Sequence, residues 1–356
     1  MLYDSKQWIA DLDTVIESLP FLSEFEKTSV MITGATGLVC SAIVDILIRY
    51  NETHENQIKI ICPGRSHEKM MGRFGSFAKK DFFSFVQYDA TSTNNTIDIP
   101  SDYIIHGASN ATPNSIINEP VETILGNIIG LKQLFEFAKA CRTKRVLYIS
   151  SSEIYGIKKD NEAFKETEYG YIDLLNPRNS YSIAKRAAET LCISYSKEYN
   201  VESVIVRPGH IYGPTASSQD NRVSSAWAYA AAKGNDIIMK SPGSQMRSYC
   251  YCLDCASAIL TVLFYGQEQK AYNISNRNSI ISIRQLGEAI ANAANVRFLS
   301  EEASSEEKKA FNPMENSSLN SETIEQLGWR GLFDASCGIR HTITILKETR
   351  ICDESI

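Results

Sequence analysis

The chain has 356 residues, of which 43% are hydrophobic and 22% charged, and its formal net charge is -6 at pH 7. This length exceeds what one hydrophobic core usually holds, so we expect a large domain joined to a smaller one. The negative charge gives no electrostatic reason to expect nucleic acid or an anionic membrane as a partner, and no apolar run is long enough to span a membrane.

The first residues of the chain and its cysteines indicate the cellular compartment that we expect. The first residues lack a basic region followed by an apolar core, so we expect no secretory signal. The nine cysteines are an odd number without framework spacing, and most stand inside apolar runs. This usage predicts reduced thiols in a cytoplasmic protein. Apolar residues at helical spacing predict a helical extension over residues 1–28.

A strand, a glycine turn and a helix follow this extension. The apolar run at residues 30–32 predicts a buried strand, and apolar positions over residues 42–48 recur at helical spacing. Gly34 permits a tight turn, and Gly37 lets the backbone approach a pyrophosphate at the helix N-terminus, where free N–H groups and the helix dipole favour an anion. Cys40 stands where the usual pattern has a third glycine. The unit predicts a dinucleotide-binding fold, with cofactor contacts from Gly34, Thr36, Gly37 and Leu38.

Further β-branched or apolar runs predict strands at residues 58–62, 82–88, 103–106 and 145–149. Helical patterns lie between them, and the alternation predicts an α/β fold with a doubly wound parallel sheet and right-handed crossovers. Ligands of such folds lie at the carboxyl ends of the strands. The polar and small residues that follow strands there are expected to contact the cofactor (Asp89, Ala90, Ala108, Ser109) or the substrate (Asn110).

The end of the second predicted strand bears on the choice between NAD and NADP. A carboxylate at this place binds the ribose 2′-hydroxyl of NAD, whereas an arginine nearby accommodates the 2′-phosphate of NADP. The turn here contains Arg65 and no acid in the expected place. The cofactor is therefore predicted to be NAD or NADP, with NADP favoured. Stacking of Arg65 on the adenine and a role for Glu68 remain the alternatives.

Hydroxyl groups and a carboxylate follow the strand at 145–149. Tyr181 and Lys185 come later, at the start of a helical pattern, and their i, i+4 spacing places them on one helix face. A free tyrosine has a pKa near ~10, which is too high for a base at neutral pH, and a nearby ammonium group favours the phenolate. We predict that Tyr181 transfers the proton, that Lys185 supplies the charge and bonds the nicotinamide ribose, and that Ser151 holds the substrate hydroxyl.

With these motifs in this order, the chain resembles the extended short-chain dehydrogenase/reductase family over about residues 30–291. The motifs that carry the resemblance lie at residues 33–37, 106–108, 150–156, 181–185 and 207–214. The family contains nucleotide-sugar epimerases, dehydratases and decarboxylases. The resemblance implies that Ser151, Tyr181 and Lys185 oxidise a sugar hydroxyl to a 4-keto intermediate as hydride passes to the nicotinamide.

The residues next to this motif bear on the branch of the family. Ser152 and Glu153 stand where the dehydratases carry Asp-Glu, and the pair resembles that of the UDP-glucuronate decarboxylases, so both are catalytic candidates. The segments at residues 177–178, 220–223 and 243–249 resemble the same enzymes. The resemblance implies that Arg222 and Arg247 neutralise a diphosphate or a sugar carboxylate by charge-assisted hydrogen bonds.

Three departures from the family pattern keep other functions open. Cys40 replaces a glycine, Arg65 replaces an NAD-selecting acid, and His210 stands near the expected substrate phosphates where relatives have asparagine. A changed cofactor preference and a changed pocket favour an NADPH-dependent reductase of a nucleotide-activated keto-sugar, such as one forming a CDP-linked alditol. Epimerisation at C4 is a further branch. A dinucleotide sensor without turnover is an alternative of a different class.

The remaining predictions concern domains and assembly. We expect a Rossmann domain over residues 29–208 and a smaller α/β substrate domain over residues 209–356, with 251–275 returning to the Rossmann domain. By analogy with relatives, the long helices through Phe137 and Tyr195 are expected to pair in a homodimer.

The cysteines near residue 252 do not predict a metal site. Strand alternation places Cys250 and Cys252 on one face, with Asp254 at a helix start, and no second Cys or His pair follows at ligand spacing. No metal is therefore expected. His106 is interpreted as a structural hydrogen-bonder at a strand end, and the polar residues 299–318 as a mobile surface segment or pocket flap.

Overall fold

The computed structural model describes residues 2–109, 111–158, 160–302 and 314–349. Within these residues the largest sheet has seven strands in the order β10-β6-β5-β4-β1-β2-β3. Every pairing in it is parallel. The strands are β1 (Ser29–Thr33), β2 (Lys59–Gly64), β3 (Phe83–Gln87), β4 (Tyr103–His106), β5 (Arg145–Ile149), β6 (Ser203–Pro208) and β10 (Ala271–Ile274).

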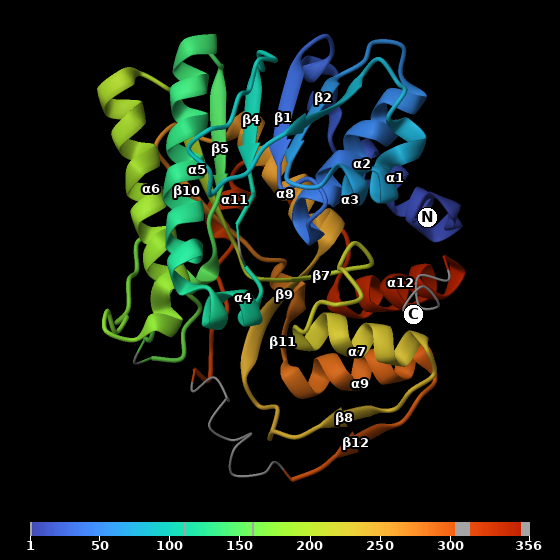
Figure 1. Ribbon diagram of the computed structural model, residues 1–356. Helices are drawn as coiled ribbons and strands as arrows, with labels where there is room; N and C mark the ends of the chain where they lie inside the picture. The colour runs from blue at the N-terminus through green and yellow to red at the C-terminus, as the bar shows by residue number, and fades with distance from the viewer. Residues whose placement is uncertain (1, 110, 159, 303–313, 350–356) are drawn as a thin grey trace.

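Helices cover both faces of this sheet (Figure 1). One face packs on α2 (Leu38–Thr53), α3 (His67–Phe74) and α8 (Cys252–Tyr265), and α1 (Lys6–Glu17) packs against α2 and α8. The other face packs on α5 (Pro120–Cys141) and α6 (Ser180–Tyr199). Strand alternation divides the core accordingly, because Ile60 and Cys62 lie in the first layer and Ile61 in the second.

The rest of the described chain forms a smaller α/β part beyond the carboxyl ends of the strands (Figure 1). Its three-stranded sheet has the order β11-β9-β7, and β8 pairs with β12. These strands are β7 (His210–Tyr212), β8 (Ile237–Met239), β9 (Met246–Tyr251), β11 (Ile280–Ser282) and β12 (Phe298–Ser300). The helices of this part are α7 (Val223–Ala232), α9 (Ile283–Ala294) and α12 (Ala335–Glu348). Two short helices, α4 (Pro113–Asn118) and α11 (Glu322–Glu325), also lie in the described residues.

The α/β fold class is confirmed, and so are the five predicted strands of the Rossmann unit. Strand β2 extends through Pro63 and Gly64, where we expected it to end, because its partner β3 pairs with both residues. The predicted strand position of Cys252 is wrong, since β9 ends at Tyr251 and Cys252 begins α8.

The predicted surface flap lies only partly within the described residues. Residues 303–313 are outside them, whereas β12 before the gap pairs with β8 and Asn316 after it bridges to Met246. The two flanks are thus held by pairing. No helix in the described ranges has the length and apolarity needed to cross a bilayer.

Candidate active site

The turn between β1 and α2 passes close to the backbone of the turn that follows β4. Gly34 has φ +73°, and a Cβ there would meet Ala108 N and the Gly107 carbonyl at 3.0 Å. Gly37 is the N-cap of α2 and provides no side-chain cap, so the first-turn N–H groups of the helix remain available to an anion. Thr36 and Leu38 flank this N-cap on either side. The cradle fits the pyrophosphate of a dinucleotide.

Cys40 explains how α2 packs without the third glycine. Its Sγ lies 2.3 Å from the point where a Cβ on Gly107 would be built. The thiol therefore fills the space next to Gly107. Because Gly107, in the turn after β4, has no side chain, α2 can carry the Cys40 side chain at this place.

His106, at the end of β4, is buried and bonded to β1. Thr33 Oγ1 accepts hydrogen bonds from the backbone N–H groups of Gly107 and Ala108, both at 3.2 Å. Its hydroxyl proton therefore goes to His106 Nδ1, at 2.7 Å. Burial, with a smaller effect of Lys185, lowers the pKa of His106 to about 3. The structural interpretation of this histidine is confirmed.

The structure brings Ser151, Tyr181 and Lys185 together where β5 ends and α6 begins. The Ser151 hydroxyl lies near enough to the Tyr181 phenol to lower its pKa, against the effect of burial. Lys185 donates from Nζ to the carbonyl of Ile149 at 2.7 Å. The same Nζ lies 4.6 Å from the centroid of the Tyr148 ring and 5.6 Å from that of Tyr181.

Burial governs the charges of this cluster. It raises the pKa of Tyr181 to about 12, and the Glu153 carboxylate acts in the same direction, while Ser151 and Arg222 oppose it. Burial also lowers the pKa of Lys185 to about 7, although the Glu189 carboxylate raises it. We expected Lys185 to lower the pKa of Tyr181. Its amine is instead close to half-protonated at neutral pH without a ligand, because a buried ammonium is poorly solvated.

Ser152 and Glu153 lie in the short turn after Ser151. The Ser151 side chain caps this turn by accepting from Glu153 N at 3.2 Å. Glu153 Oε2 lies 3.4 Å from Ser182 Oγ and 3.7 Å from an Arg178 nitrogen. The carboxylate therefore faces the same end of α6 as Tyr181.

The cofactor candidates beyond the glycine turn differ in their surroundings. Arg65 is exposed at the end of β2, and its carbonyl accepts from Gln87 Nε2. Asp89 Oδ1 accepts from both the N–H and the hydroxyl of Thr91, so this oxygen belongs to a local turn. Ala90 packs against Gly130 of α5.

Asn127 of α5 is a buried residue that the sequence reasoning missed. Ser109 Oγ and Tyr148 OH both donate to its Oδ1 at 3.2 Å, and its Nδ2 donates to the Thr123 carbonyl at 2.7 Å. A polar residue on the core-facing stripe of a helix was the available signal. Asn110, next to Ser109, lies outside the described residues.

Two arginines and a histidine meet on the smaller part. His210 of β7 is half-buried, and desolvation together with Arg247 and Arg222 lowers its pKa to about 3. Arg247 of β9 is buried and donates to the carbonyls of Met246, Met314 and Glu315. Arg222 is bound by Asp220 through a bidentate pair. The described residues give Arg247 no carboxylate partner, so this corner retains positive charge.

A buried ion pair holds α6, the helix that carries Tyr181 and Lys185, against the sheet. Arg207 of β6 is 2% exposed and donates to both carboxylate oxygens of Glu189 on α6, at 2.9 and 2.7 Å. It also donates to Tyr155 OH at 2.9 Å, so the helix is tied to the sheet and to the segment after β5. Glu189 lies one turn beyond Lys185, and that spacing was the signal in the sequence.

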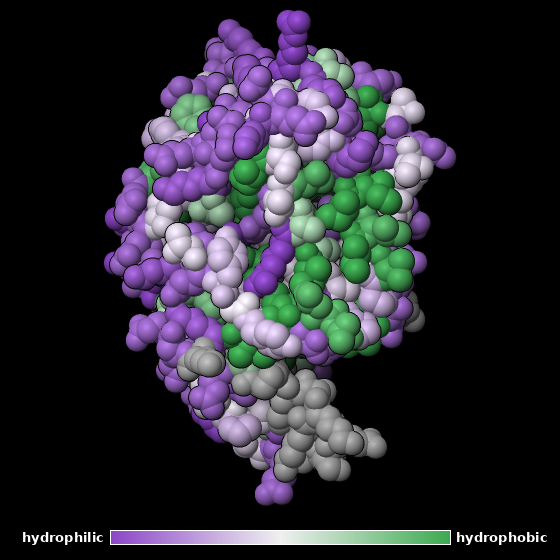
Figure 2. Space-filling model, turned by 90° about the vertical axis from the view of Figure 1, so that its left-hand side faces the viewer, coloured by the Kyte–Doolittle hydropathy of each residue, from purple (hydrophilic) through white to green (hydrophobic). Residues whose placement is uncertain are grey.

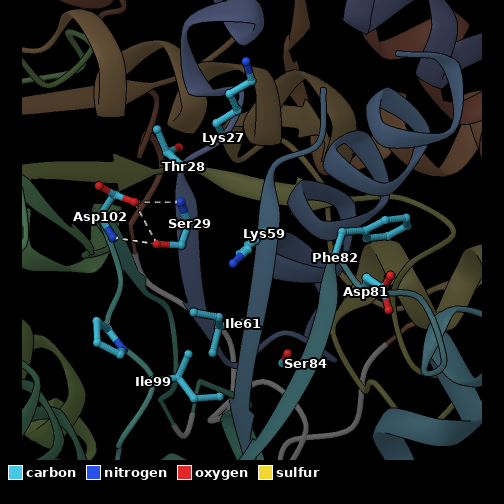
Figure 3. A pocket seen from close by; sticks show the side chains of 11 residues that line it. Lys27, Thr28, Ser29, Lys59, Ile61, Asp81, Phe82, Ser84, Ile99 and Asp102 are labelled. Carbon is cyan, nitrogen blue, oxygen red and sulfur yellow. Dashed lines mark hydrogen bonds between the residues drawn. The ribbon is translucent and has the colours of Figure 1, made fainter. Parts of the chain in front are cut away.

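A hollow of about 350 Å³ lies away from these residues, at the amino ends of the strands. Lys27, Lys59 and Asp102 are among the residues that line it (Figure 3). Asp102 is bonded there to the N–H and hydroxyl of Ser29, both at 2.9 Å. This edge is opposite the one that ligands of open α/β sheets use, so we do not assign it to the reaction.

Residues 30–275 match the family described as the NAD dependent epimerase/dehydratase family. The chain belongs to this family. It is an enzyme of the NAD-dependent epimerase/dehydratase type, and the match covers the glycine turn, the Tyr181–Lys185 helix and the return strand β10.

Relatives of known name include decarboxylases. The chain is 28% identical to UDP-glucuronic acid decarboxylase 1 of Xenopus tropicalis over 336 residues, which are 92% of this chain and 74% of the relative. It is 29% identical to UDP-glucuronic acid decarboxylase 3 of Arabidopsis thaliana, with 84% of this chain and 83% of the relative covered.

Solved structures share the fold. An epimerase from Methanothermobacter thermautotrophicus superposes with a TM-score of 0.78 at 16% identity, over 96% of this chain and 98% of that one. The UDP-glucose 4-epimerase of Thermus thermophilus, solved with NAD, gives 0.72 at 21% identity, over 92% and 100%.

Proposed function

We propose that this enzyme oxidises a hydroxyl of a nucleotide-linked sugar to a ketone and that decarboxylation of a UDP-glucuronate-like substrate follows. The observation that carries the proposal is the cluster of Ser151, Tyr181 and Lys185 beside the dinucleotide cradle. The similarity to UDP-glucuronic acid decarboxylases supports the branch.

The hydroxyls of Ser151 and Tyr181 have complementary roles in this proposal. Both bind the sugar hydroxyl, and Tyr181 accepts its proton while hydride leaves the same carbon. The bound nicotinamide supplies the hydride acceptor. Its positive charge, together with a protonated Lys185, offsets the burial that raises the pKa of Tyr181.

Oxidation at C4 makes carbon dioxide loss feasible when C5 carries a carboxylate. The new carbonyl is then β to the carboxylate, and electrons from the breaking C–C bond pass into it. No water has to be expelled, so the acid and base of the dehydratases are not required. Ser152 in place of their aspartate is compatible with this route, and Glu153 remains available beside Tyr181.

The positive corner formed by His210, Arg222 and Arg247 is the proposed site for the diphosphate. Within the described residues, the hydrogen-bond partners of Arg247 are all backbone carbonyls, which carry no full negative charge. A phosphate oxygen would balance the charge of the guanidinium. Arg222 reaches the same corner but shares its charge with Asp220.

The second candidate function is an NADPH-dependent reductase of a nucleotide-activated keto-sugar. The exposed Arg65 and the lack of an acid at the end of β2 favour it. The family is NAD-dependent, so a preference for NADP is our proposal for this chain. A net reductase consumes its cofactor, whereas a decarboxylase returns the hydride in each cycle.

A panel of UDP-, dTDP-, GDP- and CDP-sugars with each cofactor separates the branches by product mass. We expect UDP-glucuronate to lose carbon dioxide without net consumption of cofactor. Loss of water would indicate a dehydratase, and unchanged mass with a new stereochemistry an epimerase. Stoichiometric oxidation of NADPH with a gain of two hydrogens would contradict the decarboxylase proposal.

A further inference from the structure

A cysteine, a histidine and an aspartate form a hydrogen-bonded chain away from Tyr181. Cys337 Sγ lies 3.4 Å from His341 Nε2, and His341 Nδ1 lies 2.9 Å from Asp11 Oδ1. Cys337 and His341 occupy successive turns of α12, and Asp11 comes from α1. These helices lie on the side of the molecule away from α6 (Figure 1).

The hydrogen bonds orient the imidazole. Asp11 is 2% exposed in its side chain and also accepts from Gln7 Nε2 at 2.8 Å and from Tyr251 OH at 3.0 Å. Gln7 Nε2 also lies 3.3 Å from His341 Nδ1, but its shorter bond goes to Asp11. An ionised carboxylate can only accept, so we assign the proton to His341 Nδ1, which donates it to Asp11 at 2.9 Å. The lone pair of Nε2 therefore faces the Cys337 thiol and is placed to accept its proton.

The helix end at Cys337 favours negative charge on sulfur, whereas the carboxylates of Asp334 and Asp11 raise the pKa of the thiol. It lies in the first turn of α12, where Asp334 caps the helix and accepts from Cys337 N at 2.8 Å. The helix dipole stabilises an anion at this end. Burial raises the pKa of the Cys337 thiol. The resting group is therefore a thiol, and its reaction depends on the base beside it.

We propose that Cys337 is a site of S-thiolation by low-molecular-weight disulfides, activated by His341 and Asp11. His341 Nε2 takes the thiol proton as Sγ attacks one sulfur of the disulfide. The new bond joins Sγ to that sulfur, and the S–S bond of the reagent breaks. The leaving thiolate receives the proton from His341, so the protein sulfur is oxidised while half of the reagent is reduced.

The chain provides a matched control for this thiol. Of the eight cysteines in the described residues, Cys141 and Cys337 are partly exposed and the other six are buried. Cys141 is the last residue of α5, where the helix dipole disfavours an anion, and burial raises the pKa of its thiol as well. The two thiols have similar exposure but lie at opposite ends of their helices. A difference between their reaction rates therefore reports on the surroundings of Cys337.

The test uses the full chain with Cys352, which lies outside the described residues, replaced by serine. The protein is treated with oxidised glutathione, and mixed disulfides are quantified by peptide mass spectrometry over time. We expect Cys337 to react at least about tenfold faster than Cys141, because a positioned base accelerates a reaction by at least this factor. His341→Gln is expected to remove most of this difference, while His54→Gln, which changes an exposed histidine elsewhere, leaves it unchanged.

Equal rates at Cys337 and Cys141 in the parent protein would overturn the proposal, and so would a Cys337 rate that is unaffected by His341→Gln. The six buried cysteines report on folding in the same digest, since global opening would label them too. The comparison of the Cys337 and Cys141 rates in the parent protein requires no change at His341. It therefore tests the proposal even if the His341→Gln variant is unstable.

Discussion

At the scale of single residues, burial shapes the site more than charge pairing does. The sequence places Tyr181 and Lys185 on one helix face, and the structure agrees. The sequence could not predict that desolvation brings the pKa of Lys185 to about 7, because burial depends on Tyr148 and on the strand ends packed around the amine.

Lys185 makes the stability of the ligand-free protein depend on pH. Its folded pKa of about 7 is below the unfolded value of 10.5. Between these values the unfolded chain holds a proton that the folded protein lacks, so the Lys185 contribution to the free energy of unfolding increases with pH. Below pH 7 the folded protein carries a buried charge. Lys185→Met should therefore stabilise the protein most below pH 7 and progressively less towards pH 10.5.

Thermal unfolding of cofactor-free protein across this range measures the effect. Lys132→Met, which removes an exposed lysine of α5, is the control and should show no such trend. A stability difference for Lys185→Met that is constant with pH would mean that Lys185 keeps its ordinary protonation when buried.

Arg65 carries the proposed preference for NADP. Arg65→Ala should weaken NADPH binding about tenfold or more, because a charge-assisted contact with the 2′-phosphate is lost, and should change NADH binding little. Titration of both dinucleotides by fluorescence gives the ratio. Equal weakening of both would instead support stacking of the guanidinium on the adenine.

At the scale of elements, periodicity and turn chemistry predicted the Rossmann strands and the helices between them. The predictions that were wrong concern the ends of two strands. Pro63 and Gly64 pair with β3 although both residues commonly end strands, and Cys252 begins a helix where alternation continued the strand. In each case a tertiary contact overrode a local signal. Asn127 and Glu189 needed the packed helices before their partners could be known.

The turn between β1 and α2 gives the element-scale prediction. Gly34→Ala forces a side chain into a positive φ and against Ala108 and Gly107. We expect a destabilisation of about 1–3 kcal/mol and weaker dinucleotide binding. Denaturant unfolding and cofactor titration measure both.

Gly72→Ala in α3 is the matched control. A Cβ there meets no atom within 4 Å, and alanine is the better helix former. This variant should be neutral or slightly stabilising with unchanged cofactor binding. If both alanine variants behaved alike, the turn at Gly34 would not be under the proposed constraint.

At the scale of the whole molecule, the helix pair α5 and α6 is the proposed dimer face. Val121, Ile124 and Leu125 are 60%, 39% and 44% exposed on α5. Figure 2 views the side that carries α6 and shows apolar residues gathered beside polar ones. Apolar groups at this density on one helix are typical of an interface.

Charge on this face should separate the subunits. The double variant Val121→Glu, Leu125→Glu is expected to sediment as a monomer, whereas Ile238→Glu, at a 42% exposed position on β8, should leave the assembly unchanged. Sedimentation velocity at several concentrations measures this. A wild-type monomer at all concentrations would contradict the homodimer proposal.

The central claim is that Tyr181 removes the proton that lets hydride leave the sugar. The most direct measurement is the rapid-mixing absorbance of reduced nicotinamide after UDP-glucuronate meets the cofactor-loaded enzyme. We predict a transient reduced nicotinamide in wild type and in Tyr171→Phe, an exposed tyrosine control. In Tyr181→Phe its formation should be at least about a hundredfold slower, with substrate binding retained. Reduction at the wild-type rate in Tyr181→Phe would contradict the account.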